Sequence, residues 1–349
     1  MTTNGSPHPT DASTLPPRAA IVQMAMGFLV SQALIVAAEL GLADLVGRAP
    51  QTAPELAATT GTHEHALYRL LRYLASHGVF AEDSDRRFHL TPLAAVLQSD
   101  APDSVRALLQ VYADPIHWNI AGHLLSTIRT GETAFDHLYG MPFFAYLAQH
   151  TESRARFQAG MANFSGPDAA DIVRAYDFSP FQLVVDIGGG QGGFLAAVLS
   201  AYPAVRGVLY DQPQVVAHPA ELSVAGVLER CDVQGGNFFA AVPAGGDVYI
   251  LKYVLHDWGD AEAIQILQRC GEAIAPSGRV LSIEGVMRPE NQADSLKRLD
   301  LSMMLLTGGR ERTEEEFAAL YQQAGLQLTR VIPTVSQLSI IEGVRASSA

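Results

Sequence analysis

A run of glycines directly after a hydrophobic strand constrains this chain more than any other feature. The segment Leu183–Ile187 has the sequence Leu-Val-Val-Asp-Ile, and Gly-Gly-Gly-Gln-Gly-Gly follows it before a predicted helix, Phe194–Ala201. Glycine lets the backbone turn sharply and approach a ligand without interference from a Cβ atom. The pattern therefore predicts a strand, a ligand-binding loop and a helix, the first unit of a doubly wound α/β sheet.

The chain after residue 180 continues as alternating strands and helices. Helical segments separate the β-branched runs, but only a few residues, including Pro333 and Ser336, separate the last two runs. Parallel strands need a long crossover, so this last pair is predicted to form an antiparallel hairpin at the sheet edge. The predicted strands are Leu183–Ile187, Gly207–Tyr210, Val248–Leu251, Val280–Ile283, Gln327–Ile332 and Gln337–Val344. We expect a Rossmann-like doubly wound α/β sheet with an antiparallel C-terminal hairpin.

The N-terminal part has helical periodicity and resembles a winged helix. Thr52 is predicted to cap a short helix with Glu55 at the capping-box position, and Thr62 to start a second helix that ends near His77. A predicted hairpin over 78–90 would be the wing. The expected organisation is a disordered lead-in (1–17), a helical winged-helix-type dimerisation domain (18–110), a helical linker with substrate-cap helices (111–180) and a catalytic domain (181–349).

The charge balance argues against nucleic acid and membrane partners. The net charge is -13, and residues 48–100 contain five Arg and six Asp or Glu, so the winged helix has no basic footprint. The apolar stretch Ile21–Leu40 contains polar interruptions, which predicts a buried or interface helix rather than a membrane span. Cys231 and Cys270 are too few for a disulfide scaffold, and no signal-peptide pattern is present, so we expect a cytoplasmic protein.

Two acidic residues help to distinguish between possible cofactors. Gly188, Gly190 and Gly193 fit the dinucleotide fingerprint G-x-G-x-x-G, which alone is weak evidence. Asp186 precedes the loop, where a carboxylate would repel a pyrophosphate but favour a ligand with an ammonium and a sulfonium. Helix capping or loop bracing is the alternative role for Asp186. Asp211 ends the next predicted strand and can accept the ribose hydroxyls of either cofactor.

Four motifs in order give a more specific indication. They are Val185-Asp-Ile-Gly-Gly-Gly, Gly235-Gly-Asn-Phe-Phe, Leu251-Lys-Tyr-Val-Leu-His-Asp-Trp and Gly308-Gly-Arg-Glu-Arg-Thr. From about Arg18 to Val344 the chain resembles S-adenosylmethionine-dependent O-methyltransferases of plant phenylpropanoid and bacterial antibiotic pathways, including mitomycin and anthracycline O-methyltransferases. The resemblance implies a homodimer that transfers a methyl group to a hydroxyl of a small aromatic acceptor.

The resemblance also implies a set of cofactor contacts. Beside Asp186 and Gly190 of the loop, these are Gly188, Asp211, Asn237, Phe238 and Lys252. The family usually has an acid where this chain has Asn237, whose carbonyl can still accept a hydrogen bond from the adenine amino group. We therefore expect modestly altered affinity. Phe238 would offer the adenine an apolar surface.

The resemblance places a general base at His256, which follows a predicted strand at its C-terminal end. An imidazole can accept the proton of a phenol while the hydroxyl attacks the methyl group in line. Glu284 and Glu311 match the family positions that flank this histidine, although each has a structural alternative: a capped strand end or a helix N-terminal acid. Asp257 is expected to be structural or to lie on the cofactor side. No metal site is expected, because no further ligand lies at a suitable spacing.

The acceptor pocket is expected to be apolar. A helix predicted over Thr151–Tyr176 carries Phe157, Met161 and Phe164, and the helix Ser295–Leu306 carries Met303. Trp118 is a further candidate. Ordinary core packing remains the alternative for each of these side chains.

Three other functions are compatible with parts of the sequence. A related protein could bind S-adenosylmethionine and catalyse a non-methylating reaction, such as a hydroxylation or a pericyclic reaction. The glycine fingerprint alone would also suit a nicotinamide-dependent oxidoreductase, and the winged helix alone a DNA-binding regulator.

Overall fold

The computed structural model describes residues 15–288 and 294–346, which form two compact units. The first unit ends at Pro115 and the second starts at Ile116. Most of the lead-in predicted over residues 1–17 lies outside the described residues, and a helix already begins at Pro17.

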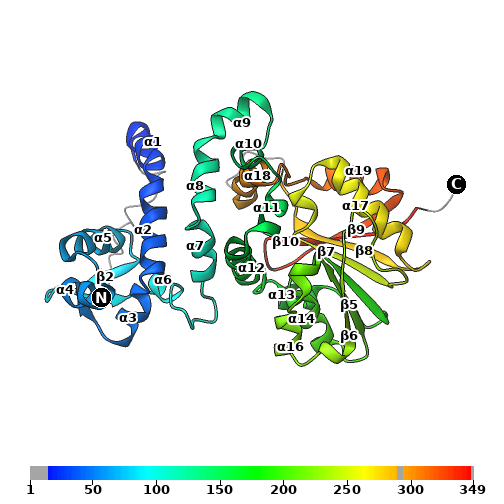
Figure 1. The fold of residues 1–349 in the computed structure, drawn as a ribbon, viewed down its shortest axis with the longest axis horizontal. Coiled ribbons are helices and arrows are strands. Elements are labelled where there is room, and N and C mark those ends of the chain that lie inside the picture. Colours follow the sequence, from blue (N-terminus) through cyan, green and yellow to red (C-terminus); the bar gives the residue numbers. More distant parts are fainter. Residues whose placement is uncertain (1–14, 289–293, 347–349) are drawn as a thin grey trace, which may run out of the picture. The chain divides into compact units, whose positions relative to one another are not determined.

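The first unit is mostly helical (Figure 1). It also contains a small antiparallel sheet of order β1-β3-β2. Its elements are α1 (Pro17–Ala25), α2 (Gly27–Glu39), α3 (Leu42–Arg48), β1 (Gln51–Thr52), α4 (Ala53–Thr60), α5 (Glu64–Ser76), β2 (Phe80–Glu82), β3 (Arg87–Leu90), α6 (Pro92–Ala95) and α7 (Arg106–Tyr112). Helices α4 and α5 followed by the β2–β3 hairpin give the predicted winged-helix arrangement. The fully buried Leu56, Leu71, Leu74 and Phe88 belong to its core.

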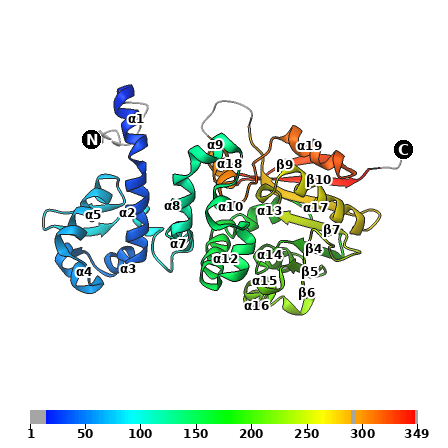
Figure 2. The ribbon, with the colours of Figure 1, turned by 45° about the horizontal axis from the view of Figure 1, so that its top comes forward.

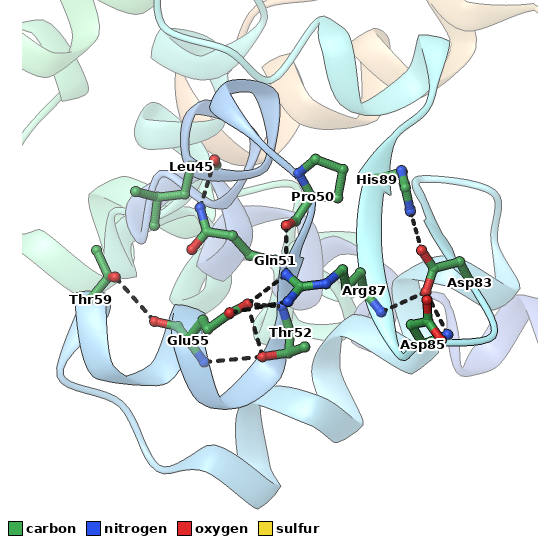
Figure 3. Close-up of polar contacts among 10 residues, drawn as sticks. All are labelled: Leu45, Pro50, Gln51, Thr52, Glu55, Thr59, Asp83, Asp85, Arg87 and His89. Carbon is green, nitrogen blue, oxygen red and sulfur yellow. Dashed lines mark hydrogen bonds and ion pairs between the residues drawn. The ribbon is translucent and has the colours of Figure 1, made fainter.

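Polar contacts join the wing to the start of α4 (Figure 3). The predicted capping box is present, since Glu55 accepts the Thr52 backbone N–H at 2.7 Å and donates its own N–H to Thr52 Oγ1 at 3.4 Å. Arg87 in β3 donates to Glu55 at 3.0 Å and to the Pro50 carbonyl at 3.0 Å. The cap predicted at Thr62 is wrong by one residue. His63 caps α5 instead, because its Nδ1 accepts the Ala66 N–H.

Helices α1 and α2 present a large exposed apolar surface. Ile21, Met24 and Phe28 are 66%, 64% and 49% exposed. The sequence predicted a buried or an interface helix over Ile21–Leu40, and burial within the chain is wrong for the first half of this segment. By length and composition, Pro17–Glu39 is the one described helical segment that could cross a membrane, with a mean hydropathy of 1.9. A protein interface and a bilayer are thus both compatible with its composition.

The second unit begins with helices and continues into a seven-stranded sheet. The helices before the sheet are α8 (Pro115–Gly122), α9 (Leu124–Thr130), α10 (Ala134–Tyr139), α11 (Phe143–Gln149), α12 (Thr151–Ser165) and α13 (Ala169–Ala175). The single helix predicted over Thr151–Tyr176 is therefore two helices. Gly166 still has helical backbone angles, but Pro167 has no N–H to continue the hydrogen bonds of the helix, so α12 ends before it.

The sheet has the order β6-β5-β4-β7-β8-β10-β9, with its last two strands antiparallel. Its strands are β4 (Leu183–Ile187), β5 (Arg206–Asp211), β6 (Cys231–Gly235), β7 (Val248–Lys252), β8 (Arg279–Gly285), β9 (Leu326–Pro333) and β10 (Leu338–Arg345). The doubly wound fold and the edge hairpin are confirmed. Strand β6 was not predicted, because an edge strand with Asp232, Gln234 and Gly235 lacks a continuous apolar run.

Helices cover both faces of the sheet (Figures 1 and 2). Helices α13, α14 (Gly193–Ala201) and α16 (Ala220–Val224), with the short α15 (Pro213–Val216), pack on one face. Helices α17 (Asp260–Ala273) and α19 (Glu314–Gln323) pack on the other, and α18 (Ser295–Leu306) packs with α10. After β6 the chain returns to the other side of β4, so a topological switch point lies between β4 and β7. Ligands of such sheets bind at this point, outside the carboxyl ends of the strands.

Candidate functional site

The glycine loop after β4 lies against the segment that follows β7. Gly188 and Gly190 have φ angles of +70° and +60°, in the left-handed region that favours glycine. A Cβ atom on Gly188 would lie 2.8 Å from Val254 and 3.9 Å from Phe238. A Cβ atom on Gly190 would meet nothing within 4 Å, so the loop is open at this residue.

Asp186 is buried beneath this loop. Its Oδ2 would lie 2.6 Å from a Cβ atom on Gly189, and it has no hydrogen-bond partner among the residues that the structure describes. Burial raises the pKa of Asp186 to about 7, although the charge of Lys252 opposes this shift. A cationic ligand group would stabilise the charged form of this carboxylate. The position of Asp186 is equally compatible with bracing of the loop.

Asp211 lies at the end of β5 and faces the same loop. Its Oδ2 accepts the Gly190 N–H at 2.9 Å and its Oδ1 accepts the Gln212 N–H at 2.6 Å. Burial raises the pKa of Asp211, and the two hydrogen bonds oppose that rise. Each carboxylate oxygen keeps a further lone pair, so this side chain can accept two vicinal hydroxyls.

Asn237 and Phe238 follow β6. Asn237 is exposed, and its Oδ1 accepts the Phe239 N–H at 3.0 Å. The ring of Phe238 meets Trp258 edge to face, with centroids 5.9 Å apart. Trp258 was not among the predicted site residues, although it belongs to the same motif as His256. Its pairing with Phe238 depends on tertiary packing that the sequence does not reveal.

Lys252 ends β7 and connects the sheet to α12. Its Nζ donates to the Ser165 carbonyl at 2.8 Å. Burial lowers the pKa of Lys252 to about 8, while the charges of Asp168 and Asp186 act in the opposite direction. The ammonium thus lies close to the predicted cofactor loop and to the end of α12.

His256 lies in a short 3₁₀ turn, Leu255–Asp257, and forms a buried pair with Glu311. The distance from His256 Nδ1 to Glu311 Oε1 is 2.8 Å. Burial by itself lowers the pKa of His256, but the carboxylates of Asp257, Glu284 and Glu311 outweigh it and raise the pKa to about 10. The structure therefore brings His256 and Glu311 together directly.

Glu284 has a different geometry from Glu311. Its Oε1 accepts the backbone N–H groups of Val254 and Leu255 at 3.0 and 2.8 Å, so it holds the turn rather than the imidazole ring. Its other oxygen is buried without a partner among the described residues, and burial raises its pKa to about 7. Asp257 Oδ1 lies 3.9 Å from His256 Nε2, and burial raises its pKa to about 6.

The residues predicted for the acceptor pocket occupy several helices. Phe164 on α12 lies 5.3 Å from the ring of Tyr253, which in turn lies 5.3 Å from the ring of His256. Phe157 instead packs on Phe143, with centroids 5.2 Å apart. The remaining three, all at least partly buried, are Met161 on α12, Trp118 on α8 and Met303 on α18. Within the described ranges, no group of three or more His, Cys, Asp or Glu side chains could hold a metal ion.

Two family models match most of the chain. Residues 122–327 match the O-methyltransferase domain, and residues 22–100 match the O-methyltransferase dimerisation domain. The chain belongs to the O-methyltransferase family. The cofactor of this family is S-adenosylmethionine, and the relatives below are enzymes that act on small natural products.

Individual relatives cover nearly the whole chain. A phenazine O-methyltransferase of Lysobacter antibioticus is 44% identical over 95% of this chain and 97% of its own length. A mitomycin 6-O-methyltransferase of Streptomyces lavendulae is 38% identical over 95% and 96%. An O-methyltransferase of neocarzinostatin biosynthesis, solved with S-adenosylmethionine and 2-hydroxy-5-methyl naphthoic acid, is 34% identical over 91% and 96%, with a TM-score of 0.79.

One relative has another activity. An aclacinomycin 10-hydroxylase of Streptomyces purpurascens is 36% identical over 87% of this chain and 83% of its own length. Membership of the family therefore does not by itself decide between methyl transfer and a non-methylating reaction.

Proposed function

We propose that this enzyme transfers the methyl group of S-adenosylmethionine to a hydroxyl of a small aromatic acceptor, with His256 as the general base. The observation that carries the proposal is the buried 2.8 Å contact between His256 and Glu311. His256 follows β7 at the switch point of the sheet, in a segment that packs against the glycine loop, and Glu311 joins it from the segment between α18 and α19.

The residues around the glycine loop fit the cofactor. The unpartnered carboxylate oxygen of Asp186 suits its ammonium, and the open backbone at Gly190 leaves room for close approach. Asp211 would accept the ribose hydroxyls, while Asn237, Phe238 and Trp258 would hold the adenine. Gly188 and Lys252 complete the proposed set. When bound, the cofactor supplies a methyl group on a positively charged sulfur.

Glu311 prepares His256 to accept a proton. A hydrogen bond from Nδ1–H to Glu311 fixes the tautomer and leaves Nε2 as the acceptor for the proton of the substrate hydroxyl. The carboxylate then stabilises the imidazolium that forms. Glu284 contributes by holding the backbone of the turn through the Val254 and Leu255 N–H groups.

The raised pKa of His256 sets a requirement for this mechanism. An imidazole with a pKa of about 10 is mostly protonated at neutral pH in the free enzyme, and only its neutral form can accept a proton. A nearby positive charge lowers the pKa of an imidazolium, so the cationic cofactor favours the neutral form. The rate is therefore expected to rise with pH as His256 loses its proton.

An aromatic acceptor suits the side chains near His256. Tyr253 and Phe164 are aromatic, and Phe157, Met161, Met303 and Trp118 are the proposed further walls. The neocarzinostatin relative was solved with a hydroxylated naphthoic acid, and the Lysobacter relative is named for phenazine. We therefore propose a flat, hydroxylated aromatic acceptor.

The exposed apolar surface of α1 and α2 supports a homodimer. Residues 22–100 match a dimerisation domain, and this range includes the exposed Met24, Phe28 and Leu29. A second copy of the chain would remove these side chains from water.

The test is to incubate the protein with S-adenosylmethionine carrying a labelled methyl group and a panel of hydroxyphenazines and hydroxynaphthoic acids. The expected result is a labelled product with one S-adenosylhomocysteine per methyl group transferred. Consumption of an acceptor without S-adenosylhomocysteine would favour the non-methylating alternative. Calorimetric binding of NAD in place of S-adenosylmethionine would contradict the assignment of the cofactor.

A further inference from the structure

Arg312, which follows Glu311 in the chain, is the largest fully buried side chain of the described structure. A buried guanidinium is costly unless its donors find acceptors. Here Nη1 donates to the Leu255 carbonyl at 2.9 Å and Nη2 to the Trp258 carbonyl at 2.8 Å. Both Nε and Nη2 donate to Asp260 Oδ1, at 3.0 and 2.8 Å. Nη1 also donates to the Arg310 carbonyl at 3.4 Å, so all five donors of the planar group are satisfied, four of them by the segment 255–260.

These acceptors lie on both sides of His256. Leu255 is the first residue of the turn that carries the imidazole, and Trp258 directly follows its last residue. The Arg312 side chain therefore holds both ends of this turn. The main chains of the two segments also touch. Arg310 donates its N–H to the His256 carbonyl at 2.9 Å, and a Cβ atom on Gly309 would overlap that carbonyl oxygen.

Glu284 and Arg312 act on opposite poles of the turn. Glu284 accepts hydrogen bonds from the N–H groups of Val254 and Leu255, whereas Arg312 donates hydrogen bonds to the carbonyls of Leu255 and Trp258. A 3₁₀ turn of three residues has few internal hydrogen bonds to define its shape. Together with the bond from the Arg310 N–H, these two buried side chains therefore define its geometry.

We propose that Arg312 is a positioning residue, whose guanidinium fixes the approach of His256 to Glu311. Its backbone is joined to Glu311 and its side chain holds the turn of His256, so the residue spans both halves of the pair. Lysine has a single nitrogen and cannot reach two carbonyls and a carboxylate in one plane. This inference rests on the proposed function in one respect, the role of His256 as the general base.

The test follows the ionisation of His256 by NMR in protein labelled with ¹⁵N-histidine, with His256→Asn to identify the signal. Arg312→Lys should loosen the contact with Glu311, so the midpoint of the titration moves down by at least one pH unit, towards the free value of about 6.5. Asp257 and Glu284, whose charges also raise the pKa of His256, are unchanged in this variant. Arg310→Lys is the matched control, because Arg310 pairs with Asp260 and Glu316 at the outer side of the segment. It should leave the midpoint unchanged.

Calorimetry with S-adenosylhomocysteine checks that each variant is folded, with a dissociation constant within about threefold of the wild type. If Arg312→Lys does not fold, Asp260→Ala is used in its place. Asp260 is half exposed, and this substitution removes only one of the partners that hold the Arg312 guanidinium. A smaller shift in the same direction is then expected. An unchanged midpoint in a folded variant would overturn the proposal. If the midpoint moves but His256→Ala leaves methyl transfer intact, the positioning role stands and the general base is wrong.

Discussion

Glu311 Oε1 lies 2.8 Å from His256 Nδ1, although 55 residues separate them in the chain. The turn after β7 supplies the imidazole, and the segment between α18 and α19 supplies the carboxylate. Both are buried, so their interaction is strengthened by the low polarity around them. This pair leads to the first two predictions.

Replacement of His256 by alanine should lower turnover while cofactor binding persists. The loss is expected to be roughly 10²- to 10⁴-fold in kcat, the usual range for a general base. Steady-state kinetics with the best acceptor, together with calorimetric binding of S-adenosylhomocysteine, measure the two properties separately. Unchanged kcat would mean that proximity of the acceptor to the methyl group suffices.

Replacement of Glu311 by glutamine should move the pH profile to lower pH. Glu311 is one of the carboxylates that raise the pKa of His256 above 6.5, so removal of its charge lowers that pKa. The rising limb of kcat/KM against pH then shifts down, because His256 becomes neutral at lower pH. The plateau rate should also fall, since the imidazolium loses its partner. A profile at the wild-type position would show that Glu311 does not act through His256.

Replacement of Asn237 by aspartate should strengthen cofactor binding modestly. A carboxylate accepts the adenine amino group by a charge-assisted hydrogen bond, which is roughly twice as strong as a neutral one. The bond from the Phe239 N–H to the side chain of residue 237 can persist, so the turn is preserved. Calorimetry should give a dissociation constant for S-adenosylhomocysteine lower by about three- to tenfold. Asn237→Ala, which removes the acceptor atom, should have the opposite effect, and equal affinities in all three proteins would place the adenine elsewhere.

A charge on the apolar surface of α2 should separate the subunits. Phe28 is 49% exposed, and Phe28→Asp would bury a carboxylate in the proposed dimer interface. Light scattering should give twice the 37.4 kDa chain mass for the wild type and the chain mass for the variant. Val335→Asp, at a single exposed apolar residue in the loop before β10, is the control and should remain dimeric. Flotation of the wild type with lipid vesicles, lost in Phe28→Asp, would assign this surface to a membrane instead.

The sequence predicted the elements whose burial is uniform along the chain. Strands β4, β7 and β8 are buried on both faces and therefore appear as mostly apolar runs, with Asp186, Ser282 and Glu284 as polar exceptions. Strand β6 has one neighbour and polar residues, so its pattern resembled a loop. The break between α12 and α13 was missed because helical periodicity continues across Pro167.

The family resemblance identified His256, Glu284 and Glu311 as a group but could not assign their contacts. Only three-dimensional packing shows that Glu311 binds the ring while Glu284 binds the backbone. Trp258 and Arg312 were present in the same motifs without a role. Arg312 bonds backbone carbonyls and the Asp260 carboxylate, and Trp258 packs against Phe238 and Phe239, and no local pattern of residue types reveals these contacts.

The close approach at Gly309 has a consequence for the evolution of this enzyme. Even the methyl group of alanine would overlap the carbonyl of His256, so no change of residue type is neutral while the turn keeps its shape. Substitutions in the helices proposed to line the acceptor pocket are free of this restriction, so acceptor specificity can change there while this contact is kept. A lineage that lost Gly309 would have to rebuild the turn, and with it the position of the proposed base His256.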